Sequence, residues 1–186
     1  MQGSMSVPQS LLSALRVMLF RAVVVAMPLL ATAQTSDHDH AANSRLVQIV
    51  RANTAQFINV NNLHGTGYAP LFGCVSGPDH GAMGIHYLNL GLVGDGQLDA
   101  RTPEALIYEP VGNTRRLVGV EYIVDAETWL NAHGGPPELE GKLFNLVGAP
   151  NRYGIPSFFE LHVWAWRDNP NGAFVDWNNN VSCEGQ

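Results

Sequence analysis

One stretch of the sequence, residues 158–166, combines side chains that could bind a metal ion or move a proton. Its residues alternate in character with a period of two, which is typical of a β-strand. On one face Glu160 and His162 project together among aromatic residues, while the other face is wholly apolar and must point into the core. A glutamate and a histidine two positions apart on a strand lie about 7 Å from each other. This pair could therefore ligate one metal ion or share a proton.

Two further residues are expected to join this pair from other strands. His86 follows the glycine-rich run 77–84 and would approach His162 if their strands lie close together. Glu121 interrupts an otherwise apolar row on its strand, and Glu109 on the neighbouring strand does so more weakly. A carboxylate buried there must be paired, bound to a metal or protonated, because burying the charge alone would cost several kcal/mol. The apolar members of the Glu121 row are expected to be Leu117, Gly119 and Ile123.

Together these residues predict a divalent-metal site, and two other interpretations stay open. Imidazole and carboxylate donors suit Zn, Fe, Mn or Cu, and an ion with an open position would give Lewis-acid or acid/base chemistry. Alternatively, the same groups form a buried hydrogen-bond network in a non-catalytic envelope module that binds a small ligand or a partner. A third interpretation is a metal-free lyase or isomerase that uses a glutamate–histidine couple. The predicted metal ligands are His86, Glu121, Glu160 and His162, and the residues expected to shape the pocket are Tyr87, Tyr122 and Trp164.

The remaining motifs and the charge balance argue against several classes of function. The chain lacks the GxSxG elbow, the P-loop, the GxGxxG fingerprint, HExxH and CxxCH. Serine hydrolases, nucleotide-binding proteins, zincins and c-type cytochromes therefore lose their usual signatures. Ten basic and 16 acidic side chains give a net charge of −6, without a basic patch for nucleic acid or an anionic membrane. The expected partner is a small molecule rather than a polyanion.

Residues 1–33 have the pattern of a secretory signal peptide. Arg16 and Arg21 supply positive charge, residues 22–30 are apolar, and Ala31-Thr32-Ala33 forms a small-x-small cleavage site. The apolar run is too short for a membrane span, which needs about 20 such residues. We expect the segment to be removed, leaving a secreted or periplasmic protein without a membrane anchor. Residues 34–43 are polar and aperiodic, and are expected to form a disordered tether.

Cys74 and Cys183 are the only two cysteines. In an oxidising compartment such a pair normally persists as a disulfide. The bond would tie the C-terminal tail to the loop before the first expected strand and, in the chain-entropy model, contribute a few kcal/mol. Free or metal-binding thiols are the alternative, which the lack of a CxxC neighbour disfavours.

Hydrophobic periodicity and turn residues predict an α+β domain over residues 44–186. Apolar residues recur at helical spacing from Ser44, a candidate N-cap, to near Asn61. The stretch 62–84 holds six glycines and two prolines and is expected to lack regular structure. The expected strands are 85–90, 105–110, 117–125 and 158–166, with a hairpin turn at Gly112-Asn113 and a short helix at 126–132. We therefore expect a single domain in which an N-terminal helix precedes an antiparallel sheet with long loops.

The motifs HY (86–87), LIY (106–108) and RLVGVEYIV (116–124) carry a resemblance to known proteins. They are similar to a stretch of the plant oil-body-associated protein family and its bacterial relatives, over roughly forty residues that include neither cysteine. A closer resemblance is to secreted bacterial proteins of unknown function that carry GAMGIHY, VEY, LHVWAW and DWN before a late cysteine. These resemblances bear on the fold, and neither implies a reaction.

Overall fold

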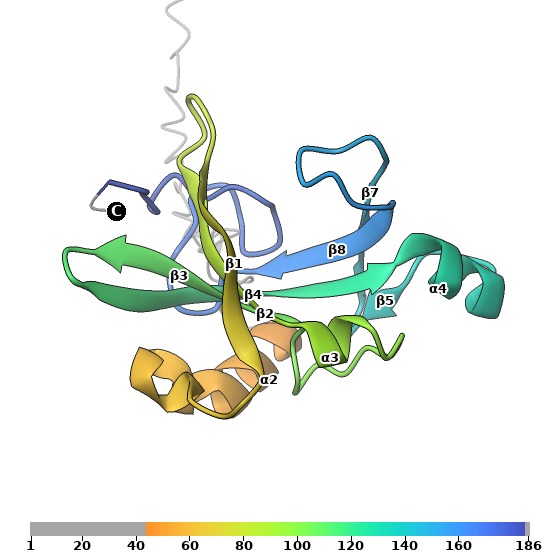
Figure 1. Ribbon diagram of the computed structural model, residues 1–186, viewed down its shortest axis with the longest axis horizontal. Helices are drawn as coiled ribbons and strands as arrows, with labels where there is room; N and C mark the ends of the chain where they lie inside the picture. Colours follow the sequence, from red (N-terminus) through yellow and green to blue (C-terminus); the bar gives the residue numbers. More distant parts are fainter. Residues whose placement is uncertain (1–43, 185–186) are drawn as a thin grey trace, which may run out of the picture. The chain divides into compact units, whose positions relative to one another are not determined.

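A six-stranded sheet is the main element of the computed structural model, which describes residues 44–184 (Figure 1). The strand order is β1-β2-β3-β4-β8-β7, and all neighbouring strands are antiparallel. The strands are β1 (Tyr68–Ser76), β2 (Ala82–Asn89), β3 (Ala105–Val111), β4 (Thr114–Asp125), β7 (Asn145–Val147) and β8 (Phe158–Val163). The other elements are α2 (Arg45–Thr54), α3 (Leu90–Val93), α4 (Ala126–His133), the 3₁₀ turns η1 (Ala55–Ile58) and η2 (Val60–Leu63), and a ribbon of β5 (Glu138–Leu139) and β6 (Lys142–Leu143). The fold is thus the mainly antiparallel α+β arrangement that the sequence predicts, while the expected signal peptide and tether lie outside the described residues.

The four expected strands correspond to β2, β3, β4 and β8. The Gly112-Asn113 hairpin is confirmed, because Val111 pairs with Thr114 and Gly112 has the positive φ (54°) that tight turns require. The end of β8 was expected at residue 166 but comes at Val163. There the chain leaves the sheet, and the Trp164 N–H donates instead to the Ala173 carbonyl.

Strand β1 corrects the expectation that residues 62–84 lack regular structure. It is the edge strand of the sheet and pairs with β2. An edge position tolerates Pro70, because only one side of the strand needs hydrogen-bond donors. The register shifts between Leu71 and Cys74, so Phe72 and Gly73 form a bulge, and both have positive φ. Cys74 therefore lies on a strand and not in the expected loop.

A second bulge changes which residues share the face of Glu121. Ile107 pairs with Gly119 and Tyr108 with Leu117, which leaves Val118 as an extra residue in β4. The alternation prediction holds for Gly119 and Ile123 but is wrong for Leu117, which packs in the main core on the opposite face. An alternation with a strict period of two cannot reveal a bulge. One added residue moves every side chain that precedes it in the strand to the other face of the sheet.

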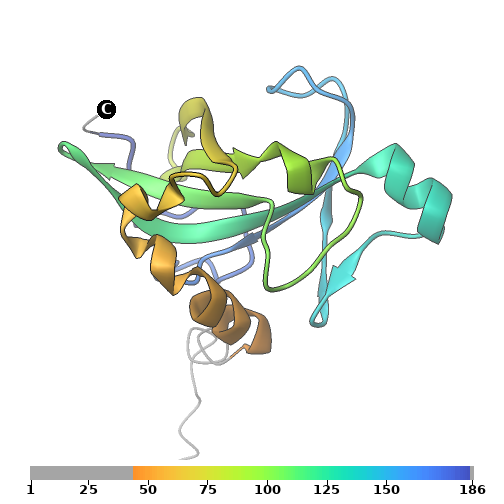
Figure 2. The same cartoon turned by 60° about the horizontal axis from the view of Figure 1, so that its bottom comes forward.

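The main core lies between one face of the sheet and the segment formed by α2, η1 and η2 (Figure 2). Helix α2 lies within the expected range but ends earlier, and Ser44 precedes it without a side-chain capping hydrogen bond. The buried Tyr108 hydroxyl donates to the Phe57 carbonyl (2.6 Å), and the Trp166 indole N–H donates to Thr54 Oγ1 (3.0 Å). Within residues 44–184 the helices are too short or too polar to form a membrane span.

The opposite face of the sheet is covered by irregular chain and holds two small apolar clusters. One contains Ala82, Ile107, Val118, Trp164 and Val181, and the other contains Ala105, Ile123 and Phe158. The polar residues of this face, Glu121 on β4 and Glu160 and His162 on β8, lie between these clusters. The gap between the two clusters is therefore where the predicted site lies.

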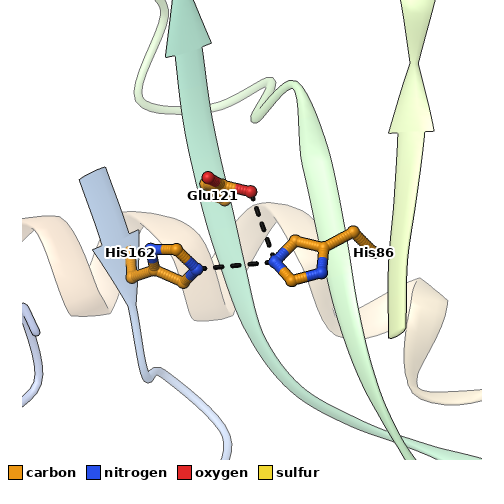
Figure 3. Close-up of side chains that lie close together, drawn as sticks. All are labelled: His86, Glu121 and His162. Atoms are coloured by element: carbon orange, nitrogen blue, oxygen red, sulfur yellow. Dashed lines mark hydrogen bonds and ion pairs between the residues drawn. The ribbon is translucent and has the colours of Figure 1, made fainter. Parts of the chain in front are cut away.

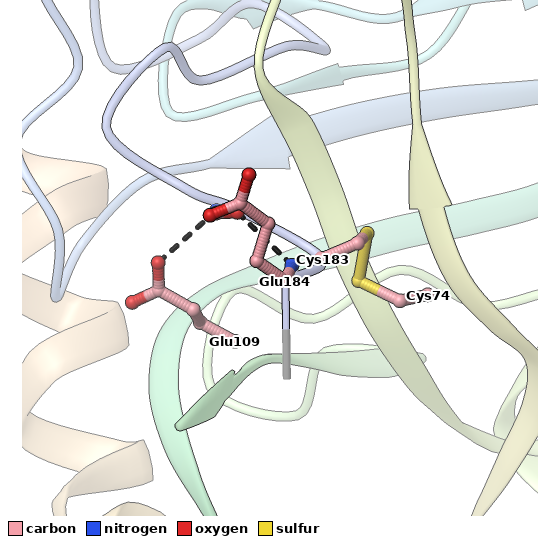
Figure 4. The surroundings of a disulfide bond; sticks show 5 residues. Cys74, Glu109, Cys183 and Glu184 are labelled. Atoms are coloured by element: carbon pink, nitrogen blue, oxygen red, sulfur yellow. Dashed lines mark hydrogen bonds between the residues drawn. A yellow bond between two sulfur atoms is a disulfide. The ribbon is translucent and has the colours of Figure 1, made fainter. Parts of the chain in front are cut away.

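A disulfide between Cys74 and Cys183 joins β1 to the end of the chain (Figure 4). The two Cα atoms are 5.7 Å apart, and the bridge spans 109 residues of sequence. Beside it, the buried Glu109 accepts the Ser182 N–H (3.1 Å) and pairs with Arg116 (3.3 Å). The disulfide prediction is confirmed, and the unpaired charge suspected at Glu109 is satisfied by structural contacts.

Candidate metal centre

The four predicted ligands lie on the same face of the sheet, and all four are buried. Each of these residues exposes between 1% and 6% of its surface. Glu121 on β4 stands directly opposite His162 on β8, and Glu160 stands opposite Ile123 two pairs along the ladder. The alternation along β8 predicted this face correctly, because Phe159, Leu161 and Val163 on the other face point into the main core.

His86 reaches the centre from β2, across the intervening strand β3. In a flat sheet β2 and β8 would lie about 14 Å apart. Both imidazoles therefore lean inward over β3 and β4. On β3 the residue opposite His86 is Ile107, and the smaller Ala105 stands opposite Glu121. On β4 Gly119 stands opposite Ile107. A side chain at Gly119 would collide with the Val163 carbonyl, 2.8 Å from an added Cβ.

Three donor atoms converge at this point, as Figure 3 shows. His86 Nε2 lies 3.4 Å from His162 Nε2 and 3.4 Å from Glu121 Oε2. The donor atoms of these three residues all lie within 4.8 Å of one another. Two donors bound at about 2.05 Å to a tetrahedral zinc ion are about 3.3 Å apart. The separations of His86 Nε2 from the other two donor atoms therefore match those between ligands of one tetrahedral ion.

Both imidazoles are held in the neutral form that binds metals. Burial lowers the pKa of His162 to about 3, and burial together with the neighbouring His162 lowers the pKa of His86 to about 3. The His86 ring also hydrogen-bonds the backbone of Gly84. Because Nε2 faces the centre, that bond engages Nδ1, so the Nδ1 proton is fixed and Nε2 presents its lone pair to the centre.

The two glutamates share a hydrogen bond. Burial, followed by the adjacent Glu160, raises the pKa of Glu121 well above its usual value. Burial raises the pKa of Glu160 to about 7, against the stabilising effect of the hydrogen bond from Glu121. The two carboxyl groups thus hold one proton between them near neutral pH, because two adjacent charges cannot both be buried. A cation at the centre would take the place of that proton.

Asp176 is a further member of the site that the sequence analysis missed. Its Oδ1 atom lies 3.7 Å from His162 Nδ1, which is buried and has no hydrogen-bond partner within residues 44–184. Glu160, His162 and Asp176 form a second group of donors within 4.8 Å of one another. Glu160 therefore belongs with Asp176 rather than with the His86 group. Asp176 lies in irregular chain after β8, where no periodicity marks it; only the DWN pattern contains it.

The expected pocket aromatics are only partly at the site. Tyr87 and Tyr122 pack on the opposite face, with the main core. Trp164 does lie at the site, with its ring 6.0 Å from that of His162 and nearly parallel to it. Each tyrosine directly follows a site residue in its strand, Tyr87 after His86 and Tyr122 after Glu121, and consecutive strand residues point to opposite faces. The expectation for the two tyrosines is therefore wrong.

A cavity of about 300 Å³ opens beside the centre, and His86 and Glu121 form part of its wall. The rest of the wall is largely apolar, with residues from β1, β2, α3, β4, β8 and the loop before β8. The sequence analysis had no signal for this cavity, since its walls come from six separate segments.

No protein-family model, no curated protein and no solved structure matches the chain. The resemblances to the oil-body-associated family and to secreted bacterial proteins therefore stay predictions, and the inferences below rest on the site alone.

Proposed function

We propose that this protein binds one divalent transition-metal ion, with zinc as the best fit, through His86 Nε2, His162 Nε2 and the Glu121 carboxylate. The observation that carries the proposal is the pair of 3.4 Å separations around His86 Nε2. Two imidazoles and one carboxylate also form the donor set of non-haem iron sites, but the tetrahedral spacing favours zinc over octahedral ions.

The protonation states support a cation at this point. With the Nδ1 proton of His86 donated to Gly84, its Nε2 atom can only accept. If His162 carries its proton on Nδ1, toward Asp176, then three electron-rich atoms face one another in a buried space. If the proton is on Nε2, the lone pair on Nδ1 faces the Asp176 carboxylate. Without a proton from Glu121 between them, the first arrangement opposes buried lone pairs, and the second turns a buried lone pair toward the partly exposed Asp176 carboxylate. A bound cation removes the conflict in both arrangements.

Three protein donors would leave the ion a fourth position for water or for a ligand atom, as in catalytic zinc sites. The ion would supply Lewis acidity there. The role of the chain is to hold the donors: Glu160 hydrogen-bonds Glu121, and with a pKa of about 7 it can hold or release a proton beside the centre. The adjoining cavity gives a ligand access from the side of His86 and Glu121.

We further propose that the protein works in a secreted or periplasmic compartment. The disulfide between Cys74 and Cys183 supports this, because such bonds persist in oxidising environments. The signal-peptide pattern of residues 1–33 supports it from the sequence side.

The alternative is a metal-free binding module. It is favoured by one observation, the hydrogen bond between Glu121 and Glu160, which partly satisfies both carboxyl groups without an ion. The two functions differ in whether zinc is retained by the untagged protein.

The test is equilibrium dialysis of the untagged protein against zinc, with metal content measured by mass spectrometry. We expect one zinc per chain, lost in His86→Ala and His162→Ala, with His64→Ala, an exposed histidine, as the control. Circular dichroism shows which variants fold. The variant Glu121→Gln tests the same site with a smaller change of side-chain shape. Wild-type protein that retains no zinc, or folded ligand variants that retain as much as the control, would contradict the proposal.

A further inference from the structure

The cavity beside the metal centre has a polar base and apolar walls. Of its thirteen lining residues, four carry polar groups: His86, Glu121, Asp125 and Tyr153, whose hydroxyl already contacts Met83 Sδ (3.7 Å). The Asp125 side chain already accepts the Thr128 N–H (2.8 Å) at the start of α4. The polar groups left for a ligand are therefore those of the centre itself. At about 300 Å³ the cavity is at the lower end of the range for ligand pockets, about 300 to 1,000 Å³.

One wall of the cavity depends on a strained residue. Phe72 sits in the β1 bulge with φ of 64°, a conformation that bulky L-residues rarely adopt. Its ring lies 5.4 Å from that of Tyr153, which comes from the loop between β7 and β8. Bulges often redirect side chains beside functional sites, and strain of this kind persists where the surroundings or function require it. The bulge places an aromatic pair on the cavity wall.

Exposed apolar side chains gather around the same cavity. Ten large apolar residues are exposed among the described residues, and four of them line this cavity: Leu71, Phe72, Leu90 and Ile155. They come from β1, α3 and the loop before β8, so three separate segments place them together. An apolar cluster around a concave site indicates that the ligand itself has an apolar body.

The carboxyl groups on the cavity wall make it acidic. Among the described residues no lysine or arginine lines it, while Glu121 and Asp125 do. An anionic head group would therefore be repelled by the chain alone and would be accepted only if a cation were bound at the base. Cavity size, apolar walls and the acidic base together limit the class of ligand.

We infer that the cavity binds a small monocarboxylic acid with an apolar body, such as a medium-chain fatty acid, with its carboxylate toward the metal centre and its chain between Phe72 and Tyr153. This inference rests on the proposed function for the head group. The apolar body follows from the walls alone.

The experiment uses cobalt-loaded full-length protein, because tetrahedral cobalt reports changes in its ligands through its visible spectrum. Octanoate and acetate are titrated separately, and both the spectrum and the heat of binding are recorded. We expect octanoate to change the cobalt spectrum and to bind at least tenfold more tightly than acetate. Binding of octanoate should fall at least tenfold when cobalt is removed. Phe72→Ala should reduce the preference for octanoate over acetate several-fold, whereas Ile58→Ala, an exposed apolar residue outside the cavity, should not.

The outcomes separate the two proposals. Protein that takes up no cobalt contradicts the proposed function and the head-group part of this inference. Protein that binds cobalt but binds octanoate and acetate equally overturns the inference while the metal centre stands. Octanoate that binds equally with and without cobalt overturns the inferred orientation, and an unchanged preference in Phe72→Ala overturns the position of the chain.

Discussion

His86 Nε2 lies 3.4 Å from His162 Nε2, although the two residues are 76 positions apart in sequence and come from strands separated by two others. The rings meet nearly at right angles, with edges facing the same point. Neither imidazole is charged, because burial lowers both pKa values to about 3. One neutral ring can donate a hydrogen bond to the other across this contact, and the same two nitrogens beside Glu121 also suit the proposed metal ligation.

Asp176 should strengthen metal binding by orienting His162. Its carboxylate lies 3.7 Å from His162 Nδ1, and outer-shell partners of this kind typically change metal affinity by about 10- to 100-fold. We predict that Asp176→Asn lowers zinc affinity by that factor without changing the stoichiometry, measured by competition with a chromophoric chelator. Asp168→Asn, an exposed aspartate of the same segment, is the control. Equal affinities of the two variants would remove Asp176 from the site.

Glu121 should limit the stability of the metal-free protein while enabling metal binding. In Glu121→Gln the amide donates permanently to Glu160, and one of the two buried acids disappears. We predict that this variant, free of metal, is more stable than wild type by about 1 kcal/mol at pH 8 and has lost zinc binding. Urea denaturation in the presence of a chelator measures the first effect, with Glu127→Gln on the surface of α4 as the control. A clear loss of stability in Glu121→Gln would favour the metal-free network.

Glu104 should make the stability of the fold depend on pH. It is buried outside the predicted site and accepts the Ile123 N–H (3.1 Å), and burial raises its pKa to about 8 from a usual 4.5. Below pH 4.5 the group is protonated in both the folded and the unfolded chain. Between pH 4.5 and 8 only the unfolded chain ionises, so folding stability is lost as pH rises through this window, by up to about 1.4 kcal/mol per pH unit.

Glu104→Gln removes this dependence, because the amide oxygen can still accept the Ile123 N–H. We predict that the difference in unfolding free energy between variant and wild type, with a chelator present, grows in favour of the variant from pH 5 to pH 8. A difference that stays constant across these pH values would show that Glu104 does not titrate in this window.

The disulfide should stabilise the fold by holding β1 and the C-terminal segment together. Cross-links that close loops of this length contribute about 2 to 5 kcal/mol. We predict that the double variant Cys74→Ser/Cys183→Ser unfolds at lower urea concentration by a corresponding amount. Wild-type protein unfolded with a reductant should match the variant, and an unchanged midpoint in both would contradict the prediction.

The site was partly predictable because its strands follow simple rules. Alternation along β8 placed Glu160 and His162 on one face, and a carboxylate in an apolar row marked Glu121. The sequence gives no comparable mark for Asp176, whose position depends on how irregular chain crosses the sheet. Strand β1 was missed because an edge strand tolerates proline and glycine that would end a central strand. Phe72 was missed for a related reason, since its position follows from a bulge that a regular period cannot represent.

The central claim is a metal ion bound between His86, His162 and Glu121, and anomalous X-ray diffraction from a zinc-loaded crystal tests it most directly. Data collected on either side of the zinc absorption edge should show one strong peak at about 2.0 to 2.2 Å from His86 Nε2, His162 Nε2 and a Glu121 carboxylate oxygen. A peak found only at exposed histidines, or at Glu160 and Asp176 without His86, would contradict the account.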